Sequence, residues 1–160
     1  MSRFSSDRVL CPACKQSYAL GTEFCSSCGS PLSGFEQLPL PGDQVGPYAI
    51  EEIVGVGGMG VVYRARTQKG TQEAALKLLS TNTAKDPRKR ERFRREIVAA
   101  SALDHPNVAP ILDSGEWMGH PYLVMPYYPG EDLRSTLKKS PRLPLNQALS
   151  IAAGVARGLA

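Results

Sequence analysis

Four cysteines near the start of the chain constrain its fold more than any other feature. They form two pairs, Cys11 with Cys14 and Cys25 with Cys28, and two residues separate the members of each pair. Each such turn can direct two sulfur atoms at one centre, and four thiolates suit the tetrahedral coordination of Zn2+. Because about twenty residues cannot bury a sufficient core, the metal would supply their folding free energy. We therefore predict a structural Zn2+ bound by these four side chains.

Two disulfide bonds are the alternative use of these cysteines, and they form in oxidising compartments. Residues 1–8 lack the apolar stretch of a signal peptide, and no apolar run approaches the about 20 residues of a membrane-spanning helix. We therefore favour zinc, expect no membrane segment, and expect a cytoplasmic protein. Residues 1–32 resemble a zinc ribbon. That resemblance implies a structural or adaptor role, with a protein partner, and nucleic-acid binding in some members.

The net charge of +4 arises in one segment. Residues 85–96 hold seven of the 19 Lys and Arg residues, with three acidic residues and one aromatic residue, Phe93. Such a segment is more typical of the solvated end of a helix than of a nucleic-acid surface. The composition, with 42% hydrophobic residues, suits a globular protein. We therefore do not expect nucleic acid as a partner.

The hydrophobic pattern predicts an α+β fold after residue 47. Strands are expected at residues 48–54, 61–66 and 71–79, as an antiparallel meander, then a helix at 87–103 and strands at 108–117 and 120–125. Asp132 can cap a short helix to residue 139, and Pro144 can open a helix to residue 160. The last helix is apolar over much of its circumference and ends without a capping signal, so we expect the chain to stop inside a domain. The Pro-, Gly- and Ser-rich stretch before the strands suggests a ribbon at 1–32, a linker at 33–47 and a second domain at 48–160.

The segment Gly55-Val56-Gly57-Gly58-Met59-Gly60 lies between two predicted strands. Glycines let backbone N–H groups approach a phosphate chain closely, although a glycine hairpin between strands is also compatible with simple flexibility. Lys77 ends an apolar strand pattern, and Glu96 follows on the predicted helix, where it could form an ion pair with Lys77. Phosphate recognition needs backbone donors, a fixed cation and an anion that orients the cation, and these residues offer all three.

Together these features resemble the amino-terminal lobe of a protein kinase, specifically the bacterial serine/threonine type, with its loop form GxGGMGxVY. The resemblance runs from about residue 48 to residue 160. It implies a five-stranded antiparallel sheet with helix αC, followed by the first helices of an incomplete carboxy-terminal lobe that ends within helix αE. It also implies that ATP and a Ser/Thr-containing protein are the partners.

The resemblance assigns roles to individual residues. It makes Lys77 the lysine for the α- and β-phosphates and Glu96 its partner, and these two are the candidate catalytic residues. Val62 and Ala75 would roof the adenine slot, Met125 would be the gatekeeper, and Asp132 would face the ribose. Pro126 stands where an acidic residue is usual but still offers its carbonyl group. The whole candidate nucleotide set is Val54, Gly55, Gly57, Gly58, Met59, Gly60, Val62, Ala75, Lys77, Met125, Pro126, Tyr128 and Asp132.

Two motifs that phosphoryl transfer requires, H-R-D-x-x-x-x-N and D-F-G, do not occur in the 160 residues. We therefore expect the Mg2+ ligands to lie beyond residue 160 and this fragment alone to be inactive. Two alternatives to a kinase remain. One is a noncatalytic scaffold or nucleotide-binding module built on a zinc ribbon and a degenerate kinase. The other is a nucleic-acid-binding zinc ribbon whose second domain is incidental.

Overall fold

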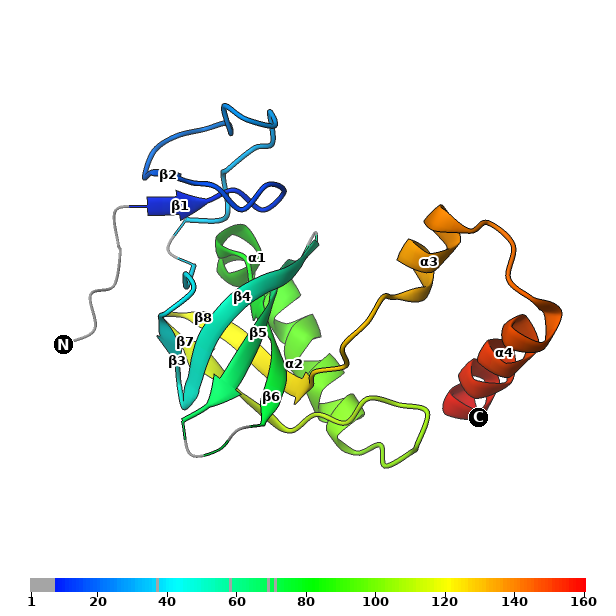
Figure 1. Ribbon diagram of the computed structural model, residues 1–160. Coiled ribbons are helices and arrows are strands. Elements are labelled where there is room, and N and C mark those ends of the chain that lie inside the picture. Colours follow the sequence, from blue (N-terminus) through cyan, green and yellow to red (C-terminus); the bar gives the residue numbers. More distant parts are fainter. Residues whose placement is uncertain (1–7, 37, 58, 69, 71) are drawn as a thin grey trace.

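The computed structural model describes residues 8–36, 38–57, 59–68, 70 and 72–160 (Figure 1). Residues 1–7 of the predicted ribbon, the candidate site residue Gly58 and the predicted strand start at Thr71 lie outside them. The elements are β1 (Arg8–Leu10), β2 (Ser17–Ala19), β3 (Gln44–Val45), β4 (Tyr48–Gly57), β5 (Gly60–Thr67), β6 (Glu73–Leu79), α1 (Thr81–Lys85), α2 (Pro87–Ser101), β7 (Asp113–Trp117), β8 (His120–Pro126), α3 (Leu133–Lys139) and α4 (Leu145–Leu159).

The strands of the described chain form a two-stranded sheet, β1-β2, and a six-stranded antiparallel sheet in the order β3-β4-β5-β6-β8-β7. The predicted meander from β4 to β6 is confirmed. The strand β3 is an addition to the five expected: Gln44 and Val45 pair with Ala49 and Tyr48 across a turn at Gly46, where φ is +56°. A two-residue strand has no readable periodicity, so the pattern of the sequence does not reveal it.

The structure also corrects one predicted strand and adds one helix to those expected. Residues 108–112, predicted as strand, are not in one, and β7 begins at Asp113. Pro110 has no N–H group for a strand ladder, and the first backbone bond to β8 runs from Leu112 N–H to the carbonyl of Val124, at 2.8 Å. The short helix α1 is also unexpected, because its polar sequence, Thr81–Lys85, carries no apolar stripe.

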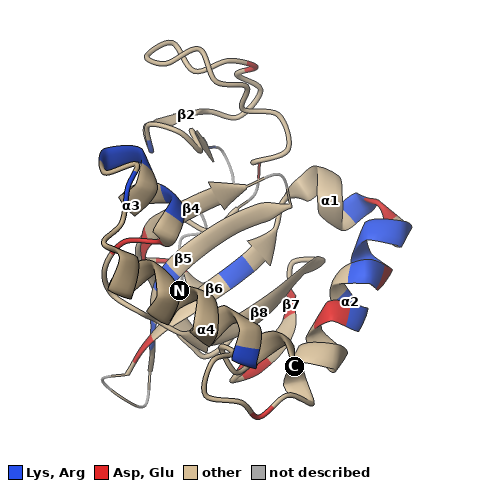
Figure 2. Ribbon diagram, turned by 90° about the vertical axis from the view of Figure 1, so that its right-hand side faces the viewer, with Lys and Arg blue, Asp and Glu red and all other residues tan. Residues whose placement is uncertain are grey.

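The predicted long helix is confirmed as α2, which ends two residues earlier than expected. Asp86 caps it by accepting hydrogen bonds from the N–H groups of Arg88 and Lys89, and Pro87 occupies the first turn. The charged residues of the helix, mostly basic with Glu91 and Glu96 among them, all lie in its first ten residues (Figure 2). Phe93 is its buried residue. The guanidinium of Arg90 contacts the carbonyl of Gly119 at 2.8 Å and a carboxylate oxygen of Glu116 at 2.7 Å, which joins the start of α2 to the β7–β8 hairpin.

The two faces of the sheet bury different side chains. On one face, Tyr63, Leu76 and Val124 belong to the main core, which also includes residues of β3 and β4. On the other face, Leu79 and Leu123 pack against Phe93 of α2 and Ala84 of α1. Side chains alternate along a strand, so Val62 and Lys77 lie on this second face. The helix α2 and the candidate nucleotide residues therefore share one side of the sheet.

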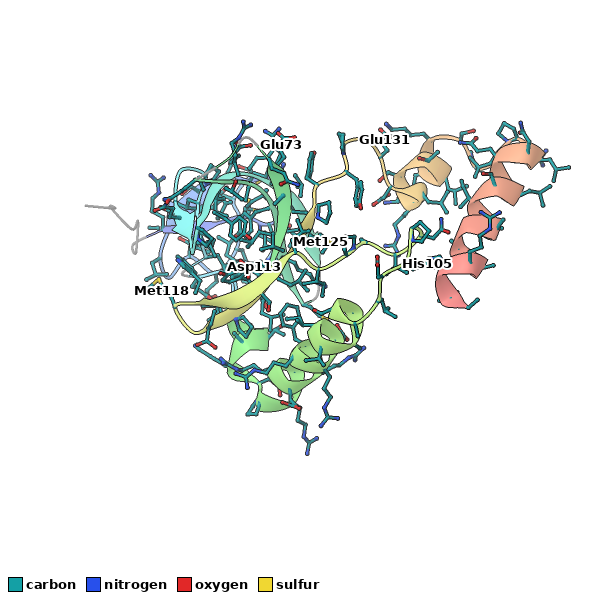
Figure 3. The ribbon with its side chains drawn as sticks, turned by 90° about the horizontal axis from the view of Figure 1, so that it is seen from below. Glu73, His105, Asp113, Met118, Met125 and Glu131 are labelled. Atoms are coloured by element: carbon teal, nitrogen blue, oxygen red, sulfur yellow. The ribbon has the colours of Figure 1, made fainter. Side chains whose placement is uncertain are left out.

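The helices α3 and α4 lie beyond the end of β8, away from the sheet (Figure 3). Neither helix contains a buried residue. The closest approach that a glycine of α4 makes is to Asn107: a Cβ on Gly158 would lie 3.1 Å from the Asn107 carbonyl oxygen. Leu145, Leu149 and Leu159 are exposed. Within the described ranges, no helix combines the length and hydropathy needed to cross a bilayer.

Candidate nucleotide site and metal centre

The glycine hairpin and Lys77 line one hollow of about 360 Å3. Its walls come from the ends of β4 and β5 and from the middle of β6, where Lys77 lies opposite Val62 in the strand register. The described residues that form it are Gly55, Val56, Gly57, Met59, Gly60, Val62 and Lys77. The structure therefore brings the predicted backbone donors and the predicted cation together.

The glycines of this hairpin have different physical reasons to be glycine. A Cβ on Gly60 would lie 2.0 Å from the carbonyl oxygen of Leu78, because β5 and β6 approach each other closely there. A Cβ on Gly57 would meet nothing within 4 Å. Gly60 is thus required by the packing of the sheet, whereas Gly57 leaves space in the hollow. That space is where a phosphate chain could approach the backbone.

Glu96 does not meet Lys77 in this structure. Its carboxylate instead contacts Nε of Arg92, one helical turn earlier, at 3.0 Å, and its side chain is 46% exposed. No ion pair within the described part of the chain joins Glu96 to Lys77. Glu96 lines a separate cavity of about 240 Å3 between α2 and the hairpin, with Met59 and Phe93 among its other walls. Met59 lines both spaces, so the two members of the expected pair lie in neighbouring cavities.

The residues expected around adenine lie where β8 leaves the sheet. Ala75 is buried and faces Met125 in the strand register, and Pro126 faces Ala74. Met125 marks the point where the chain leaves the sheet towards α3 (Figure 3). Val54 and Tyr128 are exposed, Tyr128 by 64%. Ala75 and Met125 share the strand face of Lys77, whereas Pro126 pairs with Ala74 of the main core on the opposite face, and Val54 lies on β4.

Asp132, expected near the ribose, is the N-cap of α3. Its Oδ1 accepts a hydrogen bond from the N–H of Ser135 at 2.6 Å. The backbone and side chain of Ser135 lower the pKa of this carboxyl. The carboxylate has a second oxygen, so its capping role leaves a hydrogen-bond acceptor free.

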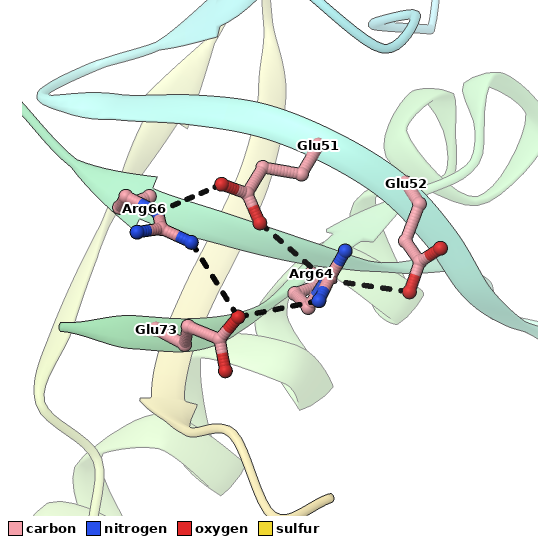
Figure 4. Close-up of polar contacts among 5 residues, drawn as sticks. All are labelled: Glu51, Glu52, Arg64, Arg66 and Glu73. Atoms are coloured by element: carbon pink, nitrogen blue, oxygen red, sulfur yellow. Dashed lines mark hydrogen bonds and ion pairs between the residues drawn. The ribbon is translucent and has the colours of Figure 1, made fainter. Parts of the chain in front are cut away.

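Five charged side chains across β4, β5 and β6 form an ion network that the sequence analysis does not single out (Figure 4). Arg64 contacts Glu51, Glu52 and Glu73 at 3.2–3.4 Å. Arg66 contacts Glu51 at 2.8 Å and Glu73 at 3.6 Å. Arg64 and Arg66 share a strand face with Val62, and the Arg64 guanidinium lies 6.0 Å from the ring centre of Tyr127. Opposite charges on neighbouring predicted strands were the available signal for this network.

The four cysteine side chains meet at one point. Their sulfur atoms all lie within 4.8 Å of one another, the distance from Cys11 Sγ to Cys28 Sγ is 3.5 Å, and that from Cys14 Sγ to Cys25 Sγ is 3.4 Å. Four sulfurs about 2.3 Å from one metal ion lie about 3.8 Å apart, so the cluster fits a tetrahedral site. All four are free thiols in the structure, which has none of the disulfides considered as the alternative.

The two cysteine turns have the same backbone geometry. Lys15 N–H donates to the Cys11 carbonyl at 2.9 Å, and Gly29 N–H donates to the Cys25 carbonyl at 2.8 Å. Both donor residues have positive φ, +62° for Lys15 and +72° for Gly29. Each residue follows the second cysteine of its pair. Two equivalent turns therefore present two sulfurs each to the centre.

Hydrogen bonding and burial shift the pKa values of the thiols in this centre in different directions. Burial opposes ionisation of Cys25, but the Tyr18 hydroxyl and the thiols of Cys28 and Cys14 lower its pKa to about 6. At Cys14, the backbone of Gln16 favours the thiolate, whereas burial and the other three thiols raise the pKa to about 12. The side chain and backbone of Ser30 also lower the pKa of Cys28, so the thiols of this centre differ in acidity.

Comparison with known proteins agrees with this arrangement of hairpin, lysine and helix. The protein kinase domain model matches residues 48–160. The chain is 39% identical over 118 residues to the serine/threonine-protein kinase PknH of Mycobacterium bovis, and the match covers 74% of this chain and 20% of PknH. It is 40% identical over 110 residues to PknE of Mycobacterium tuberculosis, over 69% of this chain and 19% of PknE. The crystal structure of the M. tuberculosis PknI kinase domain is similar, with a TM-score of 0.66 and 31% identity over 76% of this chain and 49% of that chain.

The chain belongs to the protein kinase family. Its relatives are bacterial serine/threonine-protein kinases, which confirms the resemblance drawn from the glycine hairpin and the residues after it. The chain spans about a fifth of the length of these curated relatives and about half of the PknI kinase domain.

Proposed function

We propose that this chain is the ATP-binding part of a protein kinase that transfers the γ-phosphate of ATP to Ser or Thr of a protein substrate. The shared hollow of the glycine hairpin and Lys77 is the observation that carries the proposal. It combines the backbone donors of a glycine hairpin with one cation on a sheet strand, which is what a bound triphosphate requires. Mg2+, held by residues outside this chain, would neutralise charge that develops during transfer.

Each group of residues has a proposed task. The N–H groups around Gly57 would hold the β- and γ-phosphates, and Lys77 would hold the α- and β-phosphates. Ala75 and Val62 would cover the adenine face, and the Pro126 carbonyl with the Tyr128 backbone would hydrogen-bond the adenine edge. Asp132 would bind the ribose through the oxygen that does not cap α3. Glu96 would orient Lys77 once its contact with Arg92 is broken.

The test replaces Lys77 in the full-length protein. Lys77→Ala should abolish autophosphorylation while the melting temperature stays close to that of the wild type, because Lys77 lies at the edge of a hollow and outside the hydrophobic cores. Lys138→Ala, which removes an exposed lysine of α3, is the matched control and should retain activity. If Lys77→Ala still incorporates phosphate from radioactive ATP, the role assigned to Lys77 is wrong. If the wild-type protein binds nucleotide and incorporates none, the noncatalytic alternative is correct.

We also propose that the cysteine centre holds one structural Zn2+ per chain, on the basis of its four convergent sulfurs. Four protein ligands leave no open position for catalysis, so the metal would act by folding the ribbon. Metal analysis of the purified protein should give one zinc per chain, which Cys25→Ser abolishes and Ser26→Ala leaves in place. Free thiols and dependence on ATP support a cytoplasmic location for this part of the protein. A protein partner of the ribbon remains part of the same proposal.

A further inference from the structure

The ribbon, residues 8–32, is followed by a short segment, residues 33–36, that we call the strap and that leads towards the kinase lobe. Phe35 of the strap packs against two hydrophobic cores at once. One is the ribbon core of Val9, Cys11, Cys25 and Leu32, and the other is the core of the six-stranded sheet. Leu10 of β1 also packs against the sheet core. The ribbon is therefore seated on the lobe by apolar contacts, above α1 and the tip of β4 (Figure 1).

The strap also holds α1 by hydrogen bonds. The backbone N–H of Thr81 donates to the Gly34 carbonyl at 2.9 Å, and the Thr81 hydroxyl donates to the Glu36 carbonyl at 2.6 Å. Thr81 is buried. Gly34 has φ of +86°, and a Cβ there would lie 2.5 Å from Asn82 Nδ2, so the strap and the start of α1 are in close contact. Because α1 leads directly into α2, the strap fixes the entry to the helix that carries Glu96.

The first cysteine turn faces the glycine hairpin. Pro12, Ala13 and Lys15 form one side of a groove of about 380 Å3, and residues 53–56 of β4 form the other side. Gly55 and Val56 line this groove and also line the hollow that holds Lys77. The glycine hairpin is thus a thin wall with the cysteine turn on one side and the candidate phosphate site on the other.

We infer that the metal-bound ribbon braces the glycine hairpin and α1, so that metal binding and nucleotide binding are coupled. Two of the four buried residues of the ribbon core are the sulfur ligands Cys11 and Cys25. A core of this size depends on its metal for folding, so loss of the metal removes the seat of Phe35 and the shape of the first cysteine turn. Coupling is reciprocal, so nucleotide binding raises the affinity for metal by the same factor. The inference rests on the zinc and ATP sites proposed above.

The test measures amide hydrogen exchange in the full-length protein before and after Zn2+ is removed by a chelator. Removal should raise exchange in residues 53–57 and 81–85 by at least about fivefold, the lower end of a typical coupling. Exchange in β8 should not change, because its backbone pairs with β6 and β7 and has no hydrogen bond to the ribbon or the strap among the described residues, although Val124 belongs to the core that Phe35 contacts. Saturation with a non-hydrolysable ATP analogue should raise the zinc affinity, measured by competition with a chelator, by a similar factor.

Two variants separate bracing from simple folding of the ribbon. Phe35→Ala and Thr81→Val should still bind one zinc. In both variants, metal removal should change the exchange rate in residues 53–57 and 81–85 by no more than the square root of the fold-change in the wild type. The matched control is Phe24→Ala, an aromatic residue of the ribbon that is exposed and outside its core, and this variant should retain the full metal dependence.

Three results would overturn the inference. Faster exchange confined to the ribbon after metal removal would show that the hairpin is independent of it. Faster exchange that includes β8 would show that the metal supports the whole fold and braces no particular element. Absence of zinc from the purified protein would refute both the proposed metal site and the coupling. If the protein binds one zinc but exchange in residues 53–57 and 81–85 does not depend on it, only the coupling is refuted.

Discussion

At the scale of single residues, alanine substitutions at Gly57 and Gly60 distinguish a glycine needed for nucleotide binding from one needed for folding. Gly60→Ala places a Cβ against backbone of β6, so we expect the free energy of unfolding to fall by about 1–3 kcal/mol. Gly57→Ala has space for its methyl group, so stability should change by less than about 0.5 kcal/mol, while nucleotide affinity should fall because the methyl group enters the hollow. Urea denaturation and nucleotide titration of the full-length variants measure both quantities. An equal loss of stability in the two variants would contradict this assignment.

Two buried tyrosines provide a second pair at this scale. The Tyr48 hydroxyl donates to Asp113 Oδ2 at 2.9 Å, whereas the Tyr63 hydroxyl is buried without a hydrogen-bond partner among the described residues. Tyr48→Phe should lower the free energy of unfolding by about 1 kcal/mol, and Tyr63→Phe should leave it unchanged or raise it by up to about 1 kcal/mol. Thermal unfolding of both variants measures whether the free energy of unfolding falls in Tyr48→Phe but not in Tyr63→Phe. Equal destabilisation by the two substitutions would refute this prediction.

The hydrogen bond between Tyr48 and Asp113 makes stability depend on pH. Burial and the bond to Asp113 raise the pKa of Tyr48 to about 12 from its ordinary value of 10. The folded state therefore keeps this tyrosine neutral where the unfolded state ionises it, and its contribution to stability is present below pH 10 and is lost as the pH rises towards 12. The Tyr48→Phe variant should lack this part of the alkaline loss of stability.

At the scale of elements, Glu96 of α2 has two alternative partners, Arg92 on the same helix and Lys77 on β6. We expect Arg92→Gln to free Glu96 and so to raise the nucleotide affinity of the full-length protein by up to about fivefold, since an exposed ion pair contributes about 0–1 kcal/mol. Arg95→Gln breaks an equivalent pair with Glu91, also four residues apart and also 3.0 Å long, on the same helix. This control should leave the affinity unchanged. Equal affinities for the two variants would show that Arg92 does not compete with Lys77.

The same elements show what a sequence can and cannot predict about this lobe. Asp132 before α3, and Pro144 before α4, predict helix starts correctly because these signals are local. The glycine hairpin and Lys77 are brought together by strand register, which the alternating pattern of residues encodes. The ion pair of Glu96 is different, because its carboxylate can pair with either Arg92 or Lys77. Which of the two cations it contacts depends on how α2 lies against the sheet. The seating of the ribbon through Phe35 depends on two cores at once, which no local pattern describes.

At the scale of the whole molecule, the chain divides into a packed part and an arm. The ribbon, the strap and the lobe share hydrophobic contacts through Phe35 and Leu10, whereas α3 and α4 contribute no residue to any of the three cores. Four large apolar side chains of α4 are exposed in this structure, those of Leu145, Leu149, Val155 and Leu159. The stability of the packed part should therefore be independent of the arm, although a segment with so much exposed apolar surface favours association.

Deletion of residues 133–160 from this 160-residue chain tests that division. The melting temperature should change by less than about 2 °C, since less than about 0.5 kcal/mol of stabilising contact is lost, and the deletion should reduce concentration-dependent association measured by light scattering. Phe93→Ala, which empties a fully enclosed position between α2 and the sheet, is the positive control and should lower the free energy of unfolding by about 3–5 kcal/mol. A fall in melting temperature on deletion that approaches the effect of Phe93→Ala would show that the contact of α4 with Asn107 anchors the lobe, and the packed part would then have to include the arm.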